Sequence, residues 1–161
     1  MTIFVNSVYT LETDSWRYWY IERYNMVGLD REMSNYPLST LQGAYNLIID
    51  VDASNIVSGF ETVTLAEITY WTVLSSLKPP KSVLGQITII KDIDDGQQQT
   101  YFTDPYYKIF YTRLGGGLES SDMFHIAIGE QVIVDVTQNG MLAGIWMLDL
   151  PSEIGTKYAG V

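Results

Sequence analysis

Residues 45–60 contain the run Leu47-Ile48-Ile49-Asp50-Val51, followed after a short turn by Val57-Ser58-Gly59-Phe60. Residues 130–145 contain the same pattern, Val132-Ile133-Val134-Asp135-Val136 followed by Leu142-Ala143-Gly144-Ile145. The two aspartates are 85 positions apart, and so are the two glycines, so the spacing within the motif is the same in both copies. An internal repeat of this kind indicates two similar units that pack on each other, because neither buries its apolar face alone.

The match extends upstream of this motif. Residues 14–23 align with residues 104–113 at an offset of 90, so the first copy has five more residues in its central loop. We therefore expect repeat 1, with a C-terminal helix, over residues 1–80 and repeat 2 over residues 81–161. The two repeats are expected to form one compact unit around a pseudo-twofold axis.

Most of the chain is predicted to form β-strands, because β-branched and aromatic residues cluster in short runs bounded by turn-forming residues. Asp95-Gly96 and Asn139-Gly140 predict hairpin turns, since glycine accepts a positive φ. The expected fold class is mainly β (α+β with one short helix), built from two fused hairpin-rich β repeats. Strands are expected near residues 2–5, 8–12, 16–24, 44–52 and 56–64, and near 86–93, 98–103, 106–114, 123–128, 131–137 and 141–148.

One helix is predicted over residues 65–77. Thr64 and Glu67 have the spacing of a capping box, which starts a helix, and the pair Pro79-Pro80 would end it. A similar but shorter segment begins at residues 149–153, and the linker between the copies is residues 78–85. Apolar residues recur every three positions in the predicted helix, namely Ile68, Trp71, Leu74 and Leu77.

The composition limits the classes of partner. With a formal net charge of −10 and scattered basic residues, the chain would repel a phosphate backbone, so we expect no nucleic-acid binding. An acidic surface suits a basic protein partner or serves solubility. The absence of cysteine excludes disulfides and fits a reducing cytoplasm. No stretch approaches the roughly 20 apolar residues of a membrane helix, and the N-terminus lacks a signal-peptide pattern, so a cytoplasmic protein without membrane contact is expected.

The second copy also carries a recognisable series of motifs: Tyr101-Phe102-Thr103-Asp104-Pro105, Ile109-Phe110-Tyr111, Ile133-Val134-Asp135 and Gly140-Met141-Leu142-Ala143-Gly144-Ile145. This series resembles a small uncharacterised bacterial family, a domain of unknown function. The resemblance covers residues 101–150 and, through the duplication, more weakly residues 9–65. The chain departs from the family pattern at three positions where the family has acidic residues, Lys108, Thr137 and Trp146.

The resemblance implies no catalytic activity, and some members of the family look like antitoxin-type partners of small toxins. Members are typically single-copy proteins that are expected to pair. A fused tandem would then replace the dimer by an internal pseudo-dimer.

Few residues suggest chemistry. Asp50 and Asp52 lie two apart on a predicted strand, a spacing that suits a divalent cation or a carboxylate pair. Only Asp50 has a counterpart in the second copy, which favours a structural role as a turn cap. His125, the only histidine, aligns with Thr40, and no Gly-x-Ser-x-Gly elbow places a serine beside it, so an ordinary strand histidine is expected. We expect no catalytic residue, no metal site and no cofactor.

Aromatic residues are dense, at 13% of the chain. Three of them share one face of the predicted strand at 16–24, and two share one face of the strand aligned with it. Such strands suit a core or a subunit interface, or else a ligand cleft in which aromatic rings stack and tyrosine hydroxyls orient the ligand. The candidate ligand- or partner-binding residues are Trp16, Tyr18, Tyr20, Tyr106, Phe110 and Trp146.

The function expected from these patterns is that of a non-enzymatic protein-binding module, either an antitoxin-like or an immunity-like inhibitor of a basic partner. Aromatic anchors would supply affinity, and complementary charge would speed association. One alternative is a small-molecule binding protein with a Trp/Tyr-lined pocket between the repeats. Another is a structural β subunit of an oligomeric assembly, because unpaired strand edges favour association into a homo-oligomer.

Overall fold

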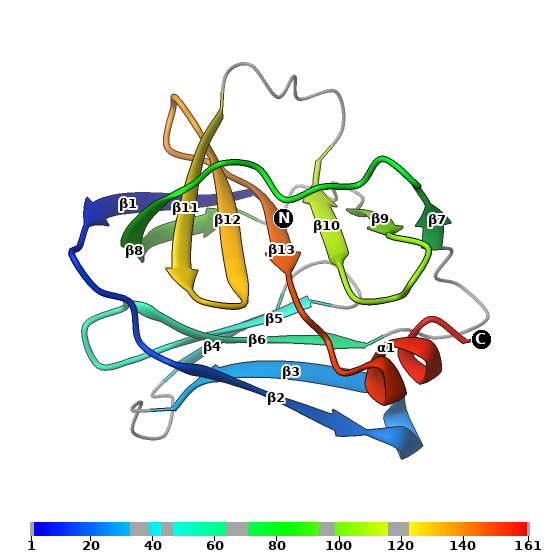
Figure 1. Ribbon diagram of the computed structural model, residues 1–161. Helices are drawn as coiled ribbons and strands as arrows, with labels where there is room; N and C mark the ends of the chain where they lie inside the picture. Colours follow the sequence, from blue (N-terminus) through cyan, green and yellow to red (C-terminus); the bar gives the residue numbers. More distant parts are fainter. Residues whose placement is uncertain are drawn as a thin grey trace.

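The computed structural model describes residues 2–32, 39–42, 47–63, 71–93, 99–115 and 123–160. Within these ranges the chain is mainly β, with one short α-helix, α1 (Ser152–Tyr158). The described strands form two sheets stacked face to face, and α1 lies at one end of the stack (Figure 1). The expected fold class, mainly β with one short helix, is confirmed.

The smaller sheet, called the small sheet below, is antiparallel throughout and has the strand order β2-β3-β6-β5-β4. A 3-10 turn at Glu22–Tyr24 joins its first two strands, and Asn25 takes a left-handed conformation (φ 44°) to close that turn. Its strands are β2 (Trp16–Ile21), β3 (Met26–Arg31), β4 (Ser39–Gln42), β5 (Leu47–Val51) and β6 (Val57–Val63).

The large sheet has the order β1-β8-β11-β12-β13-β10-β9-β7. Its strands are β1 (Thr2–Tyr9), β7 (Trp71–Val73), β8 (Val83–Ile93), β9 (Gln99–Thr103), β10 (Phe110–Leu114), β11 (Met123–Gly129), β12 (Val132–Thr137) and β13 (Leu142–Met147).

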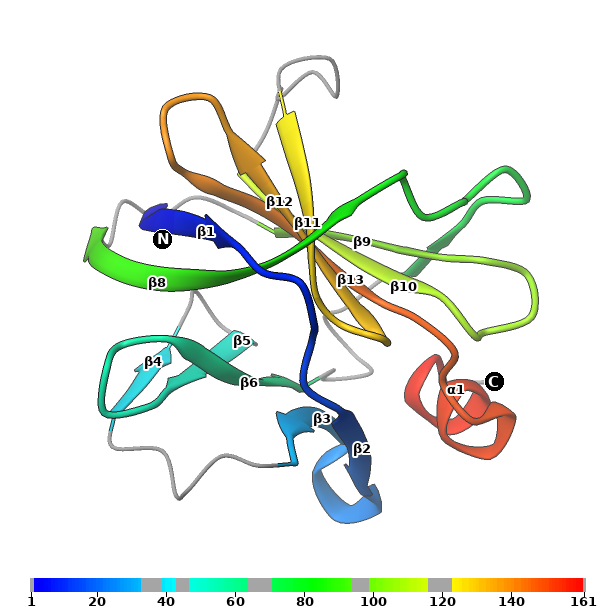
Figure 2. The same ribbon diagram turned by 60° about the vertical axis from the view of Figure 1, so that its left-hand side comes forward.

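The β1–β8 pair connects the two sheets. β8 pairs with β11 only at its first residues, Val83 and Leu84, and then runs antiparallel to β1. Further along, Thr88 of β8 forms a bridge with Ile56 of the small sheet, and the amide of Ile89 donates to the carbonyl of Asn55. Figure 2 shows β1 and β8 lying over the end of the small sheet that holds β4, β5 and β6.

Five successive strands have the same order in the two sheets, β2-β3-β6-β5-β4 in one and β9-β10-β13-β12-β11 in the other. Asp50 pairs with Gly59, and Asp135 pairs with Gly144, with a shift in register directly after each aspartate. These features agree with what a duplication would produce. The duplication itself and its pseudo-twofold axis stay predictions.

The main core fills the space between the sheets, because alternate residues of each strand point toward the opposite sheet. It includes Val27, Leu29, Ile49, Phe60, Phe110, Val134 and Ile145. A second, smaller cluster covers the outer face of the large sheet, where Leu77 packs on it from the segment that crosses this face between β7 and β8 (Figure 1). Its buried members are Tyr111, Ala127, Ile133 and Trp146.

The prediction of a helix over residues 65–77 is wrong for residues 71–77, the part of this range that the structure describes. Residues 71–73 form β7, which pairs in parallel with β9, and the amide of Leu74 donates to the carbonyl of Thr103. Edge-on contacts of Trp71 with Phe110 and Tyr101 hold this segment against the sheet, so tertiary packing overrides the helical spacing. The capping box at Thr64 and Glu67 lies outside the described residues. The shorter segment expected after residue 149 does contain the helix α1.

The strand predicted over 106–114 begins only at Phe110. Residues 104–109 form a loop in which the carboxylate of Asp104 accepts hydrogen bonds from the amides of Lys108 and Ile109, at 2.8 and 2.9 Å. Tyr107 has a φ of 56°, which no strand residue adopts. The predicted upstream alignment of residues 14–23 with 104–113 therefore sets a strand against a loop, whereas by strand order β2 corresponds to β9. The strands β3 and β4 were not predicted.

Candidate functional site

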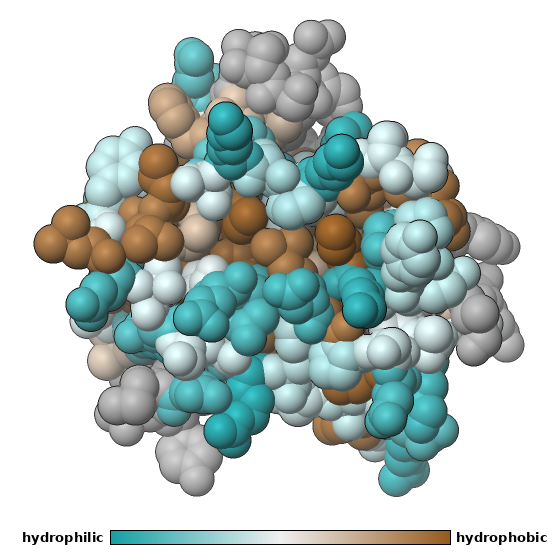
Figure 3. All heavy atoms as spheres, viewed as in Figure 1, coloured by the Kyte–Doolittle hydropathy of each residue, from teal (hydrophilic) through white to brown (hydrophobic). Residues whose placement is uncertain are grey.

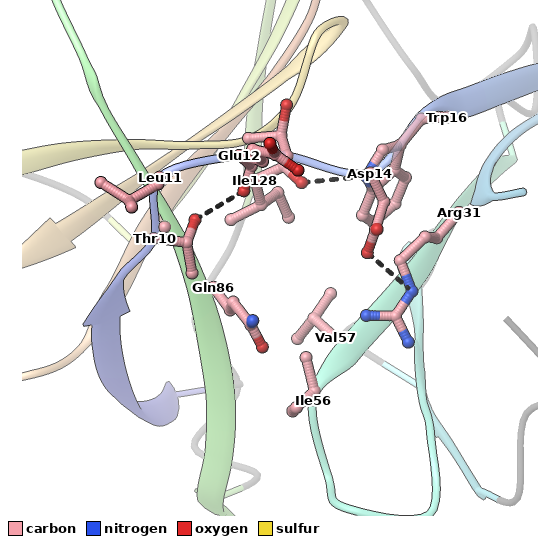
Figure 4. A pocket seen from close by; sticks show the side chains of 12 residues that line it. Thr10, Leu11, Glu12, Asp14, Trp16, Arg31, Ile56, Val57, Gln86 and Ile128 are labelled. Atoms are coloured by element: carbon pink, nitrogen blue, oxygen red, sulfur yellow. Dashed lines mark hydrogen bonds and ion pairs between the residues drawn. The ribbon is translucent and has the colours of Figure 1, made fainter. Parts of the chain in front are cut away.

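A pocket of about 400 Å³ lies between the β1–β8 pair and the small sheet (Figure 4). Ile56 and Val57 line it on the small-sheet side, and Gly85 and Gln86 line it on the β8 side. The segment that connects β1 to β2, residues 10–14, forms its outer border. In Figure 4 the side chains of Asp14, Gln86 and Val57 point into the space between these elements.

Local hydrogen bonds shape the border segment. The amide of Thr10 donates to the carbonyl of Leu84, at 3.1 Å, and so continues the β1–β8 pairing for one more residue. The hydroxyl of Thr10 then donates to the carbonyl of Glu12, at 2.8 Å, which turns the chain. Asp14 forms a parallel bridge with Gly129 of β11. The segment thus crosses from the large sheet to the small sheet along the pocket.

Trp16 lines the inner end of the pocket. Its indole Nε1–H donates to the carbonyl of Ile128, at 2.9 Å, and its ring stacks at 6.2 Å on Phe60. Because its only polar atom is engaged, the ring presents an apolar surface to the pocket.

Arg31 supplies the positive charge of the pocket, and its side chain is only 14% exposed. Its Nη2 donates to Oδ2 of Asp52 at 2.8 Å, and its Nε lies 3.6 Å from Oδ2 of Asp14. Burial by itself would raise the pKa of Asp52. The hydrogen bonds that its carboxylate accepts from Arg31 and from the amides of Ser54 and Ile56 outweigh burial and lower the pKa below its usual range.

The pocket has an excess of negative charge. Glu12 and Asp14 contribute two negative charges to the lining, and Arg31 contributes one positive charge. Asp52, which does not line the pocket, forms an ion pair with Arg31 and so offsets that positive charge. Asp14 is 52% exposed, and Glu12 forms no ion pair among the residues that the structure describes. A cation is therefore favoured over an anion at the pocket mouth.

Exposed apolar side chains border the pocket at the end of the β1–β8 pair. Leu11 is 97% exposed and Tyr9 is 69% exposed, while strand pairing sets Val8 and Tyr9 opposite Gln86 and Gly85. In Figure 3 hydrophobic spheres gather at the left-hand side of the molecule, where β1 continues into the border segment. We call this surface the apolar rim; it consists of Val8, Tyr9, Leu11, Val83 and Leu84.

The paired aspartates predicted to share a strand face do not share it. β5 ends at Val51, and Asp52 lies in the following turn, where its Oδ1 accepts from the amides of Ser54 and Ile56 at 2.8 and 3.1 Å. Asp52, and not Asp50, therefore caps this turn. In the turn between β12 and β13 the hydroxyl oxygen of Thr137 accepts from the amide of Met141, at 3.0 Å.

Asp50 instead lies on the outer face of the small sheet with two other carboxylates, Asp30 and Glu61. A Cβ on Gly59 would lie 2.6 Å from Oδ1 of Asp30 and 3.1 Å from Oδ2 of Asp50, so both carboxylates flank this glycine. Burial, then the charges of Asp50 and Asp30, raise the pKa of Glu61. Burial also raises the pKa of Asp30, with a smaller rise from Asp50, against a hydrogen bond from Trp19. In the described part of the chain no three ligand-type side chains are arranged to hold a metal ion.

Asp135 lies at the matching register position of the large sheet but has a different surrounding. Its carboxylate accepts from the hydroxyl of Tyr111 at 2.9 Å and from the indole of Trp146 at 3.1 Å, and it lies 2.7 Å from Nδ1 of His125. Burial, then the charge of Asp135, raise the pKa of Tyr111. Within the described ranges no serine or threonine hydroxyl joins His125, so these contacts make a structural network and not a catalytic triad.

The structure distributes the six predicted aromatic site residues over several places. Trp16 lines the pocket, Phe110 is fully buried in the main core, and Trp146 belongs to the outer cluster. The hydroxyls of Tyr18 and Tyr20 bond the carbonyl of Leu148 and the side chain of Asn25. Tyr106 is 76% exposed in the loop before β10. Sequence reasoning missed Arg31 and the apolar rim; the adjacent exposed residues Val8 and Tyr9 carry no pattern that separates them from a core strand.

A scan of the sequence against protein-family models finds no match, and a search of curated proteins finds no match either. The resemblance to the small bacterial family therefore stays a prediction. Among the residues that the structure describes, no helix is long and apolar enough to cross a membrane.

Proposed function

We propose that this protein is a non-enzymatic protein-binding module that engages a basic partner at the apolar rim and the adjoining pocket. The observation that carries the proposal is the rim itself. Its five exposed apolar side chains come from both strands of one sheet end and from the segment that follows. Apolar surface that is gathered in this way and bordered by polar residues is typical of protein interaction sites.

Charge supports a basic partner. The chain has a formal net charge of −10, and the carboxylates of Glu12 and Asp14 stand directly beside the rim. An apolar centre with a charged border is the usual anatomy of a specific interface, in which the anchors supply affinity and the charges supply association rate.

An antitoxin-like or immunity-like inhibitor is the biological role that fits this chemistry, and the cytoplasm is the compartment expected for it. The fused tandem would act as an internal pseudo-dimer. The equal strand order of the two sheets supports this idea, since a duplicated unit would keep its topology. Self-association into a homo-oligomer through the edge strand β1 is the alternative outcome.

A second candidate function is small-molecule binding. The observation that favours it is the pocket between the two sheets, with the apolar ring surface of Trp16 at its inner end. Its volume of about 400 Å³ falls within the range of ligand pockets, which is roughly 300–1,000 Å³. Native mass spectrometry of the purified protein separates the two functions: a bound small molecule without a protein partner favours the second.

The direct test places a photo-crosslinking amino acid at position 11 of the rim and, in a matched control, at position 106, because Leu11 and Tyr106 are both highly exposed apolar positions. The expected result is one basic protein captured through position 11 and not through position 106. The captured protein should bind the purified chain, and Tyr9→Glu should abolish that binding. No capture at position 11, capture of the same proteins at both positions, or binding that Tyr9→Glu leaves unchanged would overturn the proposal.

A further inference from the structure

The strand β2 forms an unprotected edge of the small sheet, at the lower border of the molecule in Figure 1. Proteins usually shorten, bend or cover their edge strands, because unpaired backbone groups invite another chain. The edge strands β7 and β4 are only three and four residues long, while β1 has a bulge between Phe4 and Val5 and donates the amide of Val5 to the carbonyl of Gly140. β2 has six residues, no proline and no bulge in its pairing with β3, and no described strand pairs with its outer side.

The outward backbone groups of β2 belong to alternate residues. The amide of Glu32 donates to the carbonyl of Ser15 at 2.8 Å, which sets the alternation of hydrogen bonds between β2 and β3. In an antiparallel pair every second residue bonds the neighbouring strand, and the residues between them direct their N–H and C=O groups the other way. Tyr18 and Tyr20 therefore direct theirs to the outer edge.

The strand β9 has the same place in the large sheet, and the observed registers match the two strands residue by residue. Gly59 pairs with Asp50 in the small sheet, as Gly144 pairs with Asp135 in the large sheet. From each glycine the register leads across two further ladders, to position 17 of β2 and to position 100 of β9. The residues that correspond at the outer edges are Tyr18 and Tyr101, and then Tyr20 and Thr103.

In the large sheet this edge is occupied by β7. Trp71 lies opposite Tyr101 in a parallel pairing, and the amide of Leu74 donates to the carbonyl of Thr103 at 2.9 Å. The rings of Trp71 and Tyr101 also meet edge-on, with their centroids 5.3 Å apart. The chain thus contains one bound example of the strand that the edge of β2 lacks within the described ranges.

From this correspondence we infer that the outer edge of β2 binds an extended segment of a partner protein, which joins the small sheet as a parallel strand. The segment places a large apolar side chain opposite Tyr18 and donates an amide to the carbonyl of Tyr20, which are the two contacts that β7 makes with β9. Strand addition of this kind gives affinity through backbone hydrogen bonds and specificity through alternate side chains. This edge shares no residue with the apolar rim, so the inference goes beyond the proposed function.

The probe is a synthetic peptide with the sequence of residues 71–77 of this chain, because that segment already binds the corresponding edge. The matched control peptide has proline at the position of Leu74, which removes the amide that would donate to Tyr20. Heteronuclear NMR of the purified full chain follows the backbone amides of Tyr18 and Tyr20. Saturable shifts of both amides, together with their protection from hydrogen exchange, are expected with the first peptide and not with the control.

Two variants of the chain locate the contact. Tyr20→Pro removes an outward amide and should abolish binding of the peptide, while the strand should persist because an edge strand tolerates proline where its N–H faces outward. Tyr20→Ala loses the same side chain but keeps the amide, and should bind the peptide as the original chain does. The control peptide tests the same hydrogen-bonded pairing without any change in the chain, so it decides the question if Tyr20→Pro does not fold.

Several results would overturn the inference. These are no binding of the first peptide, equal shifts with the proline peptide, binding that a folded Tyr20→Pro variant retains, and shifts confined to Tyr101 and Thr103 of β9. A concentration-dependent dimer of the chain that Tyr20→Pro abolishes would also overturn it, because the edge would then belong to a second copy. Failure to capture a partner at the apolar rim would leave this inference standing, since the peptide experiment does not involve the rim.

Discussion

The indole Nε1–H of Trp16 donates a hydrogen bond to the carbonyl oxygen of Ile128, at 2.9 Å, and this bond joins the small sheet to the large sheet at the inner end of the pocket. The neighbouring Gly129 makes the approach possible, because a Cβ at that position would lie 2.2 Å from Cδ1 of the indole. The tryptophan and the glycine therefore fix how closely the two sheets meet beside the candidate site.

Trp16→Phe should destabilise the protein by about 1–3 kcal/mol, because the buried carbonyl of Ile128 loses its donor while most of the apolar contact remains. Urea denaturation followed by circular dichroism measures the change in the free energy of unfolding. Tyr24→Phe, at an exposed ring, is the matched control and should change it little. An unchanged stability of Trp16→Phe would contradict a structural role of this hydrogen bond.

Arg31→Gln should lower stability at neutral pH, by about 1–3 kcal/mol, because it removes a charged hydrogen bond to Asp52 in a partly buried position. Arg17→Gln is the control, since the pair of Arg17 with Glu32 is exposed and should contribute less than about 1 kcal/mol.

The ion pair of Arg31 with Asp52 should also make the stability of the protein depend on pH. The lowered pKa of Asp52 gives stability that is present above the unfolded pKa and is lost as the pH falls through the folded pKa.

In Arg31→Gln the pH-dependent stability that Asp52 contributes should be smaller. The difference in stability between the variant and the original chain should therefore narrow as the pH falls below about 4, the usual pKa range of aspartate. Thermal unfolding at a series of pH values measures this difference. A difference that stays constant down to low pH would contradict the ion pair as its cause.

Glu61→Gln should stabilise the protein at neutral pH, by less than about 1 kcal/mol because the side chain is partly exposed and solvent screens its charge. The pKa of Glu61 is raised in the folded protein, so its favourable contribution exists at acid pH and is lost as the pH rises through the folded pKa. The gain in melting temperature should therefore be larger at pH 7 than at pH 4. The control Glu130→Gln should show no such pH-dependent gain, and a melting temperature of Glu61→Gln below that of the original chain at neutral pH would rule out the repulsion from Asp30 and Asp50.

Asp135→Ala should cost about 3–5 kcal/mol, the range for removing one partner from a buried charged network. The change leaves the hydroxyl of Tyr111 and the indole of Trp146 without their acceptor. Asp92→Ala, at an exposed position of β8, removes the same group without these partners and should be near neutral. Tyr111→Phe, which removes a single donor, should cost less than Asp135→Ala. Chemical denaturation of the three variants tests the order, and equal effects of Asp135→Ala and Asp92→Ala would contradict the network.

Much of the fold follows from local patterns. The strands near 44–52, 56–64, 131–137 and 141–148 were predicted because short apolar runs end at turn residues, and the observed β5, β6, β12 and β13 lie within one to three residues of those limits. The missed strand β3 contains Gly28 and Asp30, which weaken a strand pattern. Its glycine is needed because the indole of Trp19 lies over it: a Cβ there would lie 1.8 Å from that ring.

The residues of the candidate site were harder to predict from the sequence than the strands. Aromatic density pointed to Trp16, which lines the pocket, but equally to Phe110, which is fully buried, because an aromatic residue on a strand gives no sign of which side the second sheet covers. Asp50 and Asp135 have identical local sequence spacing, yet one lies among carboxylates and the other among hydrogen-bond donors. Neighbouring strands, and not the motif, set these environments.

The amino-acid sequence by itself was therefore sufficient to predict a mainly β fold and to exclude disulfides. It was also sufficient to predict the hairpin at Asn139-Gly140, where Gly140 has a positive φ of 79°. Packing between distant segments decided that residues 71–73 form a strand, that Arg31 pairs with Asp52, and that a pocket opens beside Leu11. The physical reason is range: turns and apolar alternation act over a few residues, whereas these three features depend on contacts that form only when the two sheets close on each other.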